Sequence, residues 1–171
     1  NKGLIKIYEG LANDFYYSDP TRMLVFLDNH DMDRVHTVFN HNLKKTKMAL
    51  GIIFLLPRIP QVLYGTEILM DNSDKPGSHG FIRKDFPGGW EGDKVSGFLS
   101  KGLSEDQLEG QKFVKKILDF RKNNTVIHNG KTLHFSPQDG VYVFFRYAKE
   151  KTVMVIINKN SKPVSYTHLR A

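Results

Sequence analysis

Two short apolar runs with one helical pattern between them constrain the fold more than any other feature of this chain. Met23–Leu27 is apolar throughout and ends abruptly in charge at Asp28. Five apolar residues are too few for a typical helix and suit a strand buried on both faces. Pro60–Tyr64 is a second short strand of this kind, and the pattern between the two is helical until Pro57. Strand, helix and strand in this order predict a parallel sheet with crossover helices.

Two further helices are predicted on either side of this unit. Leu4–Phe15 carries apolar residues at helical intervals. Ser104, three residues before Gln107, makes a capping box that begins a helix ending near Asn123. The segment between Gly65 and Gly102 is rich in Gly, Asp and Ser and has no clear period. Loops of this length are usually functional or disordered.

The pattern changes to a strand-like period from Lys131 onwards. Three runs follow this period, at Thr132–Phe135, Val141–Tyr147 and Val153–Asn158. Asp139-Gly140, between the first two runs, is a strong hairpin-turn signal. The sequence therefore predicts an antiparallel β module after the helical and parallel-strand region.

The positive charge of the chain invites, but does not support, a nucleic-acid partner. A formal net charge of +7 could neutralise phosphates. The cations are nevertheless distributed over two predicted helices, where a solvated face is expected. They are Lys44, Lys45 and Lys47 on one helix and Lys112, Lys115, Lys116, Arg121 and Lys122 on the other. We therefore predict no nucleic-acid partner.

Other features narrow the class of protein without fixing its compartment. The longest apolar run, Ala49–Pro57, falls short of the roughly 18 residues of a membrane span. The chain has no cysteine, which excludes disulfides and thiolate chemistry but leaves the compartment open. It begins with Asn1-Lys2-Gly3, without an initiator Met or secretory signal, so we expect a fragment of a longer protein. Localisation and oligomeric state are not predicted.

The residues with the clearest chemical potential follow the first apolar run. Phe26–Asp31 reads Phe-Leu-Asp-Asn-His-Asp and stands where a buried strand meets its loop. In a (β/α)8 barrel, active-site residues project from this carboxyl end of a strand. An ionised carboxylate there can stabilise an oxocarbenium-like carbon, and an imidazole can bind sugar hydroxyls. His30 alone would more often be structural, but within Asn29-His30-Asp31 a functional interpretation is favoured.

This hexapeptide resembles the motif at the end of the seventh barrel strand in the α-amylase family, glycoside hydrolase family 13. The family pattern is an aromatic residue, two variable residues, and Asn-His-Asp. By that resemblance, Asp31 corresponds to the carboxylate that stabilises the transition state, and His30 to a ligand of sugar hydroxyls. Arg34 corresponds to a frequent Arg three residues further on; we count it among the substrate-binding residues and expect it to brace the loop.

Two further motifs follow in the family's order. Ile59–Glu67 looks like the eighth strand, although Arg58 stands where the family usually has Gly. His79–Trp90 is similar to the loop after that strand in the neopullulanase and cyclomaltodextrinase branch. Three residues of this loop are candidates for sugar contact or loop ordering: Arg83, Asp85 and Trp90. Tyr64 is expected to be structural, and Trp90 could equally fill a gap.

The resemblance implies a specific architecture and activity. Residues 1–128 would be the carboxy-terminal part of a catalytic (β/α)8 TIM barrel, with about strands seven and eight. Residues 129–171 would begin a β-sandwich domain that is truncated here, and we assign no structure to the tail from Tyr166 to Ala171. The parent would hydrolyse α-1,4-glucans such as maltooligosaccharides, cyclodextrins or pullulan with retention of configuration.

The catalytic pair of such an enzyme is not expected in this chain. A retaining glycosidase needs a nucleophile and a general acid about 5 Å apart. In the family they stand on the fourth and fifth strands, which would precede residue 1, and Asp28, Asp33 and Glu67 do not match them. The isolated chain should therefore be inactive. Two rival hypotheses are a transglycosidase on the same substrates and a non-catalytic barrel that binds glycans or a protein.

No cofactor or metal site is predicted. A set of carboxylates and imidazoles could be drawn as a zinc site, but its spacing fits no familiar signature. Its members are Asp28, His30, Asp31, Asp33, His36 and His41. Asp71–Lys75 begins like a calcium loop, yet Lys75 occupies a ligand position and no Glu closes the loop. Calcium, which some members of the family bind, thus has no identified site here.

Overall fold

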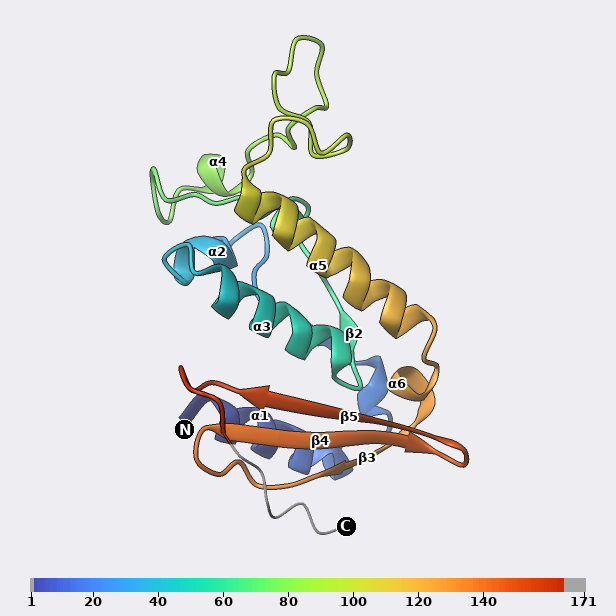
Figure 1. Ribbon diagram of the computed structural model, residues 1–171. Helices are drawn as coiled ribbons and strands as arrows, with labels where there is room; N and C mark the ends of the chain where they lie inside the picture. Colours follow the sequence, from blue (N-terminus) through green and yellow to red (C-terminus); the bar gives the residue numbers. More distant parts are fainter. Residues whose placement is uncertain (1, 165–171) are drawn as a thin grey trace. The chain divides into compact units, whose positions relative to one another are not determined.

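The computed structural model describes residues 2–164, and the chain forms two compact units (Figure 1). One unit comprises Arg22–Asn124, and the other joins Asn1–Thr21 to Thr125–Ala171. The predicted boundary between residues 128 and 129 stays a prediction. The tail from Tyr166 to Ala171, to which no structure is assigned, lies outside the described residues.

The unit of residues 22–124 is built on two parallel strands and two long helices. Strand β1 (Leu24–Val25) pairs in parallel with β2 (Ile59–Pro60), and α3 (Leu43–Leu55) connects them. Helix α5 (Glu105–Lys122) follows and packs alongside α3 (Figure 1). The predicted order of strand, helix, strand and helix is therefore confirmed.

Two aspects of the strand prediction are wrong. The second strand spans Ile59–Pro60 and not Pro60–Tyr64. The first strand was expected to be buried on both faces, yet Leu24 is 60% exposed and its partner Ile59 is 46% exposed. Only one face is covered, because Val25 packs against the core formed by α3 and α5. That core consists of Leu50, Ile53, Phe54 and Val114. On the other face, the exposure of Leu24 and Ile59 shows that residues 2–164 leave the two-stranded sheet largely uncovered.

Helix α5 is fixed at both ends by side-chain hydrogen bonds. At its start the predicted capping box is present: Gln107 N donates to Ser104 Oγ, and Ser104 N donates to Gln107 Oε1. Near its end Arg121 is buried and donates to the carbonyls of Phe54, Leu56 and Arg58. These carbonyls belong to the last turn of α3 and the chain after it, where a helix leaves acceptors without backbone donors. Arg121 thus ties the two helices together.

The long segment from Gly65 to Gly102 is irregular, as predicted, but not featureless. It contains η3 (Thr66–Ile68) and the single-turn helix α4 (His79–Ile82). The single-turn helix α2 (Val35–Val38) lies earlier in the chain, in the loop between β1 and α3. Gly65 begins the segment with a φ of 85°, a left-handed conformation that L side chains rarely adopt. The segment therefore holds its side chains in place through short helices and turns, without the hydrogen bonds of a β-sheet.

The second unit is an antiparallel sheet packed on a helix. Strands β3 (Lys131–His134), β4 (Val141–Ala148) and β5 (Lys151–Asn158) pair in the order β3-β4-β5. The predicted hairpin turn is confirmed, with positive φ at both Asp139 and Gly140. The short helix α6 (Val126–Asn129) precedes the sheet.

Helix α1 (Lys2–Ala12) covers one face of this sheet and continues into η1 (Asn13–Tyr16). A further 3₁₀ turn, η2, spans Pro20–Arg22. The Tyr8 ring lies 4.8 Å from the His134 ring and 6.3 Å from the Tyr142 ring. The opposite face carries exposed apolar side chains, namely Leu133, Phe135, Met154 and Ile156. The sheet therefore has one packed face and one open apolar face.

We predict that Arg121→Met lowers the free energy of unfolding by about 2 kcal/mol, because buried carbonyls at the end of α3 lose their donors. Urea titration of the purified chain would measure this change. Lys122→Met is the matched control, since Lys122 is exposed on the same helix turn. Equal midpoints for the two variants would contradict the capping role of Arg121.

Candidate active site

The turn after β1 presents His30 and Asp31 to solvent. Asn29 Oδ1 accepts a hydrogen bond from Asp31 N at 2.8 Å, and Asn29 O accepts one from Met32 N at 3.2 Å. An Asn side chain that binds the backbone two residues on stabilises a tight turn. The side chains of His30 and Asp31 are 65% and 56% exposed. The turn thus projects a carboxylate and an imidazole from the carboxyl end of the strand.

Three of the predicted site residues meet in this turn. Arg83 Nη2 lies 2.7 Å from Asp31 Oδ1, and Arg83 Nε donates to the His30 carbonyl at 2.9 Å. His30 Nε2 lies 3.2 Å from Asp31 Oδ2. Each carboxylate oxygen of Asp31 therefore faces one nitrogen, and each keeps a second acceptor position for a ligand.

His79 belongs to the same cluster and was not singled out as a site residue in the sequence. Its Nδ1 lies 3.0 Å from Arg83 Nη2 and 4.0 Å from Asp31 Oδ1. The only signal in the sequence was its spacing of four residues from Arg83, which places two helical side chains on one side.

Asp85 and Trp90 form a separate pair. Trp90 Nε1 donates to Asp85 Oδ2 at 3.1 Å, and Asp93 Oδ2 accepts from the backbone N–H groups of Gly88 and Trp90. The Trp90 side chain is exposed. The polar contacts of Asp85 are with this loop and not with Asp31, so the structure brings these two residues to each other rather than to the turn.

Arg34 is completely buried beneath the turn. Its Nε donates to the Ile82 carbonyl at 2.9 Å, its Nη1 donates to the Tyr64 carbonyl, and its guanidinium lies 5.0 Å from the centre of the Tyr64 ring. A side chain with no exposed surface cannot touch a sugar in this structure. Of the two expectations for Arg34, substrate contact is corrected, whereas bracing agrees with the structure, in which Arg34 holds three loops from inside. A short motif cannot distinguish these roles, because burial depends on residues distant in sequence.

Asp28 is the buried carboxylate that accompanies Arg34. Its Oδ2 accepts from Val35 N at 2.8 Å, and Thr66 Oγ1 lies 3.3 Å from both carboxylate oxygens. Burial raises the pKa of Asp28, although the hydrogen bond from Val35, the nearby Arg34 and the Thr66 hydroxyl each lower it. Asp28 thus holds the start of α2 and the η3 segment against the same loop.

Buried Asn72 and partly exposed Asp33 complete the polar framework. Asn72 Oδ1 accepts from Arg34 N at 2.9 Å, and Asn72 Nδ2 donates to Asp33 Oδ1 at 2.6 Å. Asp33 also accepts from Gly77 N at 2.6 Å. The Gly77 and Asn72 hydrogen bonds hold the pKa of Asp33 below its usual range. These contacts connect the turn after β1 to the long irregular segment.

The acidic and imidazole side chains do not form a metal site in the described part of the chain. In residues 2–164, no group of three or more His, Cys, Asp and Glu side chains is placed to hold an ion. Asp71 Oδ1 instead accepts from Ser73 N at 3.0 Å in a local turn. Over the same described range, no helix combines the length and the apolar character needed to cross a membrane.

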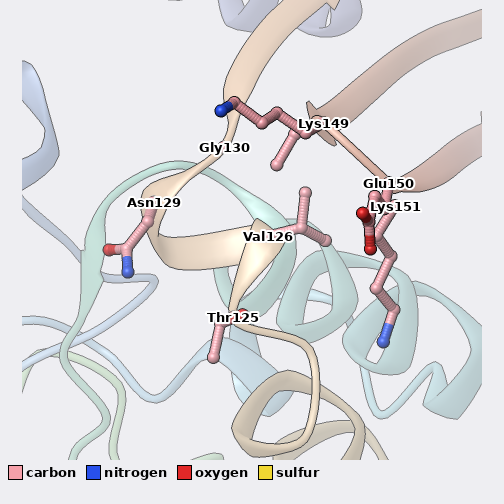
Figure 2. Close-up of a pocket in the computed structure, with 8 residues that line it drawn as sticks. Thr125, Val126, Asn129, Gly130, Lys149, Glu150 and Lys151 are labelled. Atoms are coloured by element: carbon pink, nitrogen blue, oxygen red, sulfur yellow. The ribbon is translucent and has the colours of Figure 1, made fainter.

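A surface hollow of about 410 Å³ lies in the other unit (Figure 2). Its lining comes from α6 and the β4–β5 hairpin and comprises Thr125, Val126, Asn129, Gly130, Ala148, Lys149, Glu150 and Lys151. Figure 2 shows the charged side chains of the hairpin around Val126. None of the predicted site residues is among this lining. We therefore define the candidate active site by the Asp31 cluster.

Comparison with known proteins identifies the family. The family model "Alpha amylase, catalytic domain" matches residues 5–130, and the model "Cyclo-malto-dextrinase C-terminal domain" matches residues 132–170. The chain belongs to the α-amylase family. Its fold is the carboxy-terminal part of a (β/α)8 barrel followed by antiparallel strands, which confirms the predicted fold class.

Individual relatives of this α-amylase family chain are only moderately similar. Alpha-amylase 3 of Dictyoglomus thermophilum is 31% identical over 80% of this chain and 30% of its own length. The cyclomaltodextrin glucanotransferase of Paenibacillus macerans is 26% identical over 85% of this chain and 18% of its own length. The crystal structure of an Anoxybacillus α-amylase superposes with a TM-score of 0.69 at 25% identity, covering 91% of this chain and 31% of that one. The chain thus spans less than a third of these relatives.

We predict that Arg34→Met lowers the free energy of unfolding by about 3–5 kcal/mol, because the carbonyls of Tyr64 and Ile82 lose a buried donor and buried Asp28 loses a nearby positive charge. Urea titration would test this. The exposed Lys45→Met is the control. The double variant Asp28→Asn with Arg34→Met should recover part of the loss, since no charge then remains buried without its partner. A single variant as stable as the control would contradict the bracing role.

Proposed function

We propose that this chain supplies the Asp31 cluster to an enzyme that cleaves or transfers α-glucosidic bonds in α-glucans. The observation that carries the proposal is the geometry of Asp31 itself. Its carboxylate is exposed at the carboxyl end of β1, next to His30 and within 2.7 Å of Arg83. That position suits a residue which must face a sugar while the rest of its loop is held by buried contacts.

The proposed mechanism is double displacement with retention of configuration. Cleavage of a glycosidic bond passes through an oxocarbenium-like transition state. Asp31 would stabilise the developing positive charge, because a fixed carboxylate costs no reorganisation when the charge appears. His30, beside it at 3.2 Å, would bind a sugar hydroxyl. These roles require no organic cofactor.

The proposed substrates are α-1,4-linked glucans, including maltooligosaccharides, cyclodextrins and pullulan. The printed names of the relatives, α-amylase and cyclomaltodextrin glucanotransferase, support this class. In the long loop, the exposed ring of Trp90 offers a plane on which a pyranose could stack, and its indole N–H is held by Asp85. Arg83 and Asp85 would order this side of the site.

The nucleophile and the general acid would come from parts of the barrel outside these residues. We expect the isolated 171-residue chain to release no reducing sugar from maltohexaose, since Asp31 alone cannot form the glycosyl intermediate. A reducing-sugar assay on the purified chain would measure this. Turnover that survives removal of trace contaminants would overturn the proposed division of roles.

In the enzyme encoded by the full reading frame, we predict that Asp31→Asn lowers kcat on maltohexaose by at least about a hundredfold, because the neutral amide no longer stabilises the transition state. Thermal melting should be unchanged, since Asp31 is exposed.

Asp74→Asn is the matched control, because Asp74 is an exposed carboxylate that pairs with a lysine of the same long segment. It should leave kcat unaltered. Full activity of Asp31→Asn would refute the proposed role, and an inactive wild type would favour a non-catalytic barrel that binds glycans or a protein.

A transglycosidase is the second candidate, and the glucanotransferase names among the relatives favour it. The same residues would serve when a sugar hydroxyl, rather than water, attacks the glycosyl intermediate. Product analysis with a labelled glucose acceptor separates the two: labelled longer sugars indicate transfer, and unlabelled short sugars indicate hydrolysis.

A further inference from the structure

We propose that His79 and Arg83 are positioning residues that fix the carboxylate of Asp31 for catalysis. This inference rests on the proposed function and adds to it a residue, His79, and a role for α4. The helix would thereby couple the long irregular segment to the turn after β1.

The geometry of Arg83 ties main chain and side chain of the turn together. Its Nε donates to the His30 carbonyl at 2.9 Å, while its Nη2 lies 2.7 Å from Asp31 Oδ1. The planar guanidinium holds its donors in a rigid fork, so two contacts on one turn fix both its position and its orientation. Without Arg83, the Asp31 side chain, of which more than half is exposed, would keep only its contacts with the imidazoles of His30 and His79.

His79 restrains Arg83 from the opposite side. Its Nδ1 lies 3.0 Å from the same Nη2 that contacts Asp31. A neutral imidazole with its proton on Nε2 accepts a hydrogen bond there, so Nη2 donates to both His79 and Asp31. The spacing of four residues along α4 brings the two side chains together. His79 therefore acts on Asp31 through Arg83.

The base of α4 is anchored to the buried framework. Ile82 is 1% exposed, and its carbonyl accepts from Arg34 Nε at 2.9 Å. Tyr64 donates its hydroxyl to the Lys84 carbonyl at 2.9 Å. The helix that begins at His79 and is followed by its C-cap residue Arg83 is thus held by contacts on both sides of Arg83. A fixed base is what a positioning role requires, because a mobile helix would transmit its motion to the carboxylate.

The arrangement leaves Asp31 able to bind a sugar. Arg83 occupies one acceptor position on Oδ1, and His30 faces Oδ2. An ionised carboxylate has about four acceptor positions in total. A sugar hydroxyl can therefore donate to Asp31 without displacing Arg83, so the proposed restraint is compatible with the complex.

The test uses the enzyme of the full reading frame and measures kcat and KM separately on maltohexaose. Arg83→Met should lower kcat about ten- to hundredfold, with KM changed less than about threefold, because ground-state binding persists while alignment is lost. Guanidinium ion added to this variant should restore part of kcat. Arg83→Lys should keep kcat below that of the wild type, since one ammonium cannot reproduce the contacts with both the His30 carbonyl and Asp31.

The His79 variants test the second contact. His79→Leu should lower kcat severalfold, whereas His79→Gln should stay near wild type because its amide oxygen can accept from Arg83. Lys84→Met is the control, since it removes a neighbouring cation whose partner is the exposed Asp74. All variants should melt within a few degrees of wild type.

Each outcome bears on a different statement. A raised KM with unchanged kcat for Arg83→Met would overturn the positioning role and assign Arg83 to direct sugar contact. Wild-type kcat for His79→Leu would show that His79 is not a positioning residue. If Asp31→Asn itself keeps full activity, the proposed function fails, whereas an inactive Asp31→Asn beside fully active Arg83 and His79 variants refutes this inference alone.

Discussion

The buried guanidinium of Arg34 is the interaction on which the local structure around the site depends. A cation without exposed surface loses its hydration, and only nearby acceptors and charges can offset that loss. Asp28 supplies the charge, and the carbonyls of Tyr64 and Ile82 supply acceptors from two other loops. Because these partners stand 30 and 48 residues away along the chain, the hydrogen bonds of Nε and Nη1 order three segments at once, while Nη2 is buried without a hydrogen-bond partner. The exposed turn with His30 and Asp31 rests on that order.

The parts of the fold that sequence could predict are those whose cause is local. The apolar run before Asp28, the capping box of Ser104 and Gln107, and the Asp139-Gly140 turn each depend on a few neighbouring residues, and the structure contains all three elements. The extent and burial of the strands were harder. Whether Leu24 is covered depends on what lies above the sheet, and no pattern within one strand carries that information.

In the candidate site, too, residues within a contiguous motif could be predicted, whereas contacts between distant segments could not. Asp31 and His30 could be singled out because their motif is contiguous, and Arg83 because its loop is the third motif. Asn72 lies outside the three motifs, and its contact crosses 38 residues to Arg34; His79 begins the third motif, but the sequence alone does not show that it contacts Arg83 and lies near Asp31. Arg34 was found by its position in the motif but counted with the wrong set of residues. A motif records residue type, whereas burial is a property of the assembled loops.

The distal half of the long segment is closed upon itself. Gly97 N donates to the Pro87 carbonyl at 2.9 Å, Ser96 and Lys101 exchange backbone hydrogen bonds, and the rings of Phe86 and Phe98 lie 4.7 Å apart. Gln111 of α5 holds the Gly97 carbonyl from outside at 2.7 Å. Most of the contacts that hold this loop therefore lie within the loop itself. The residues around Trp90 can therefore be replaced while these contacts, α4 and the turn after β1 stay in place. This loop is a suitable position for substitutions that alter ligand preference.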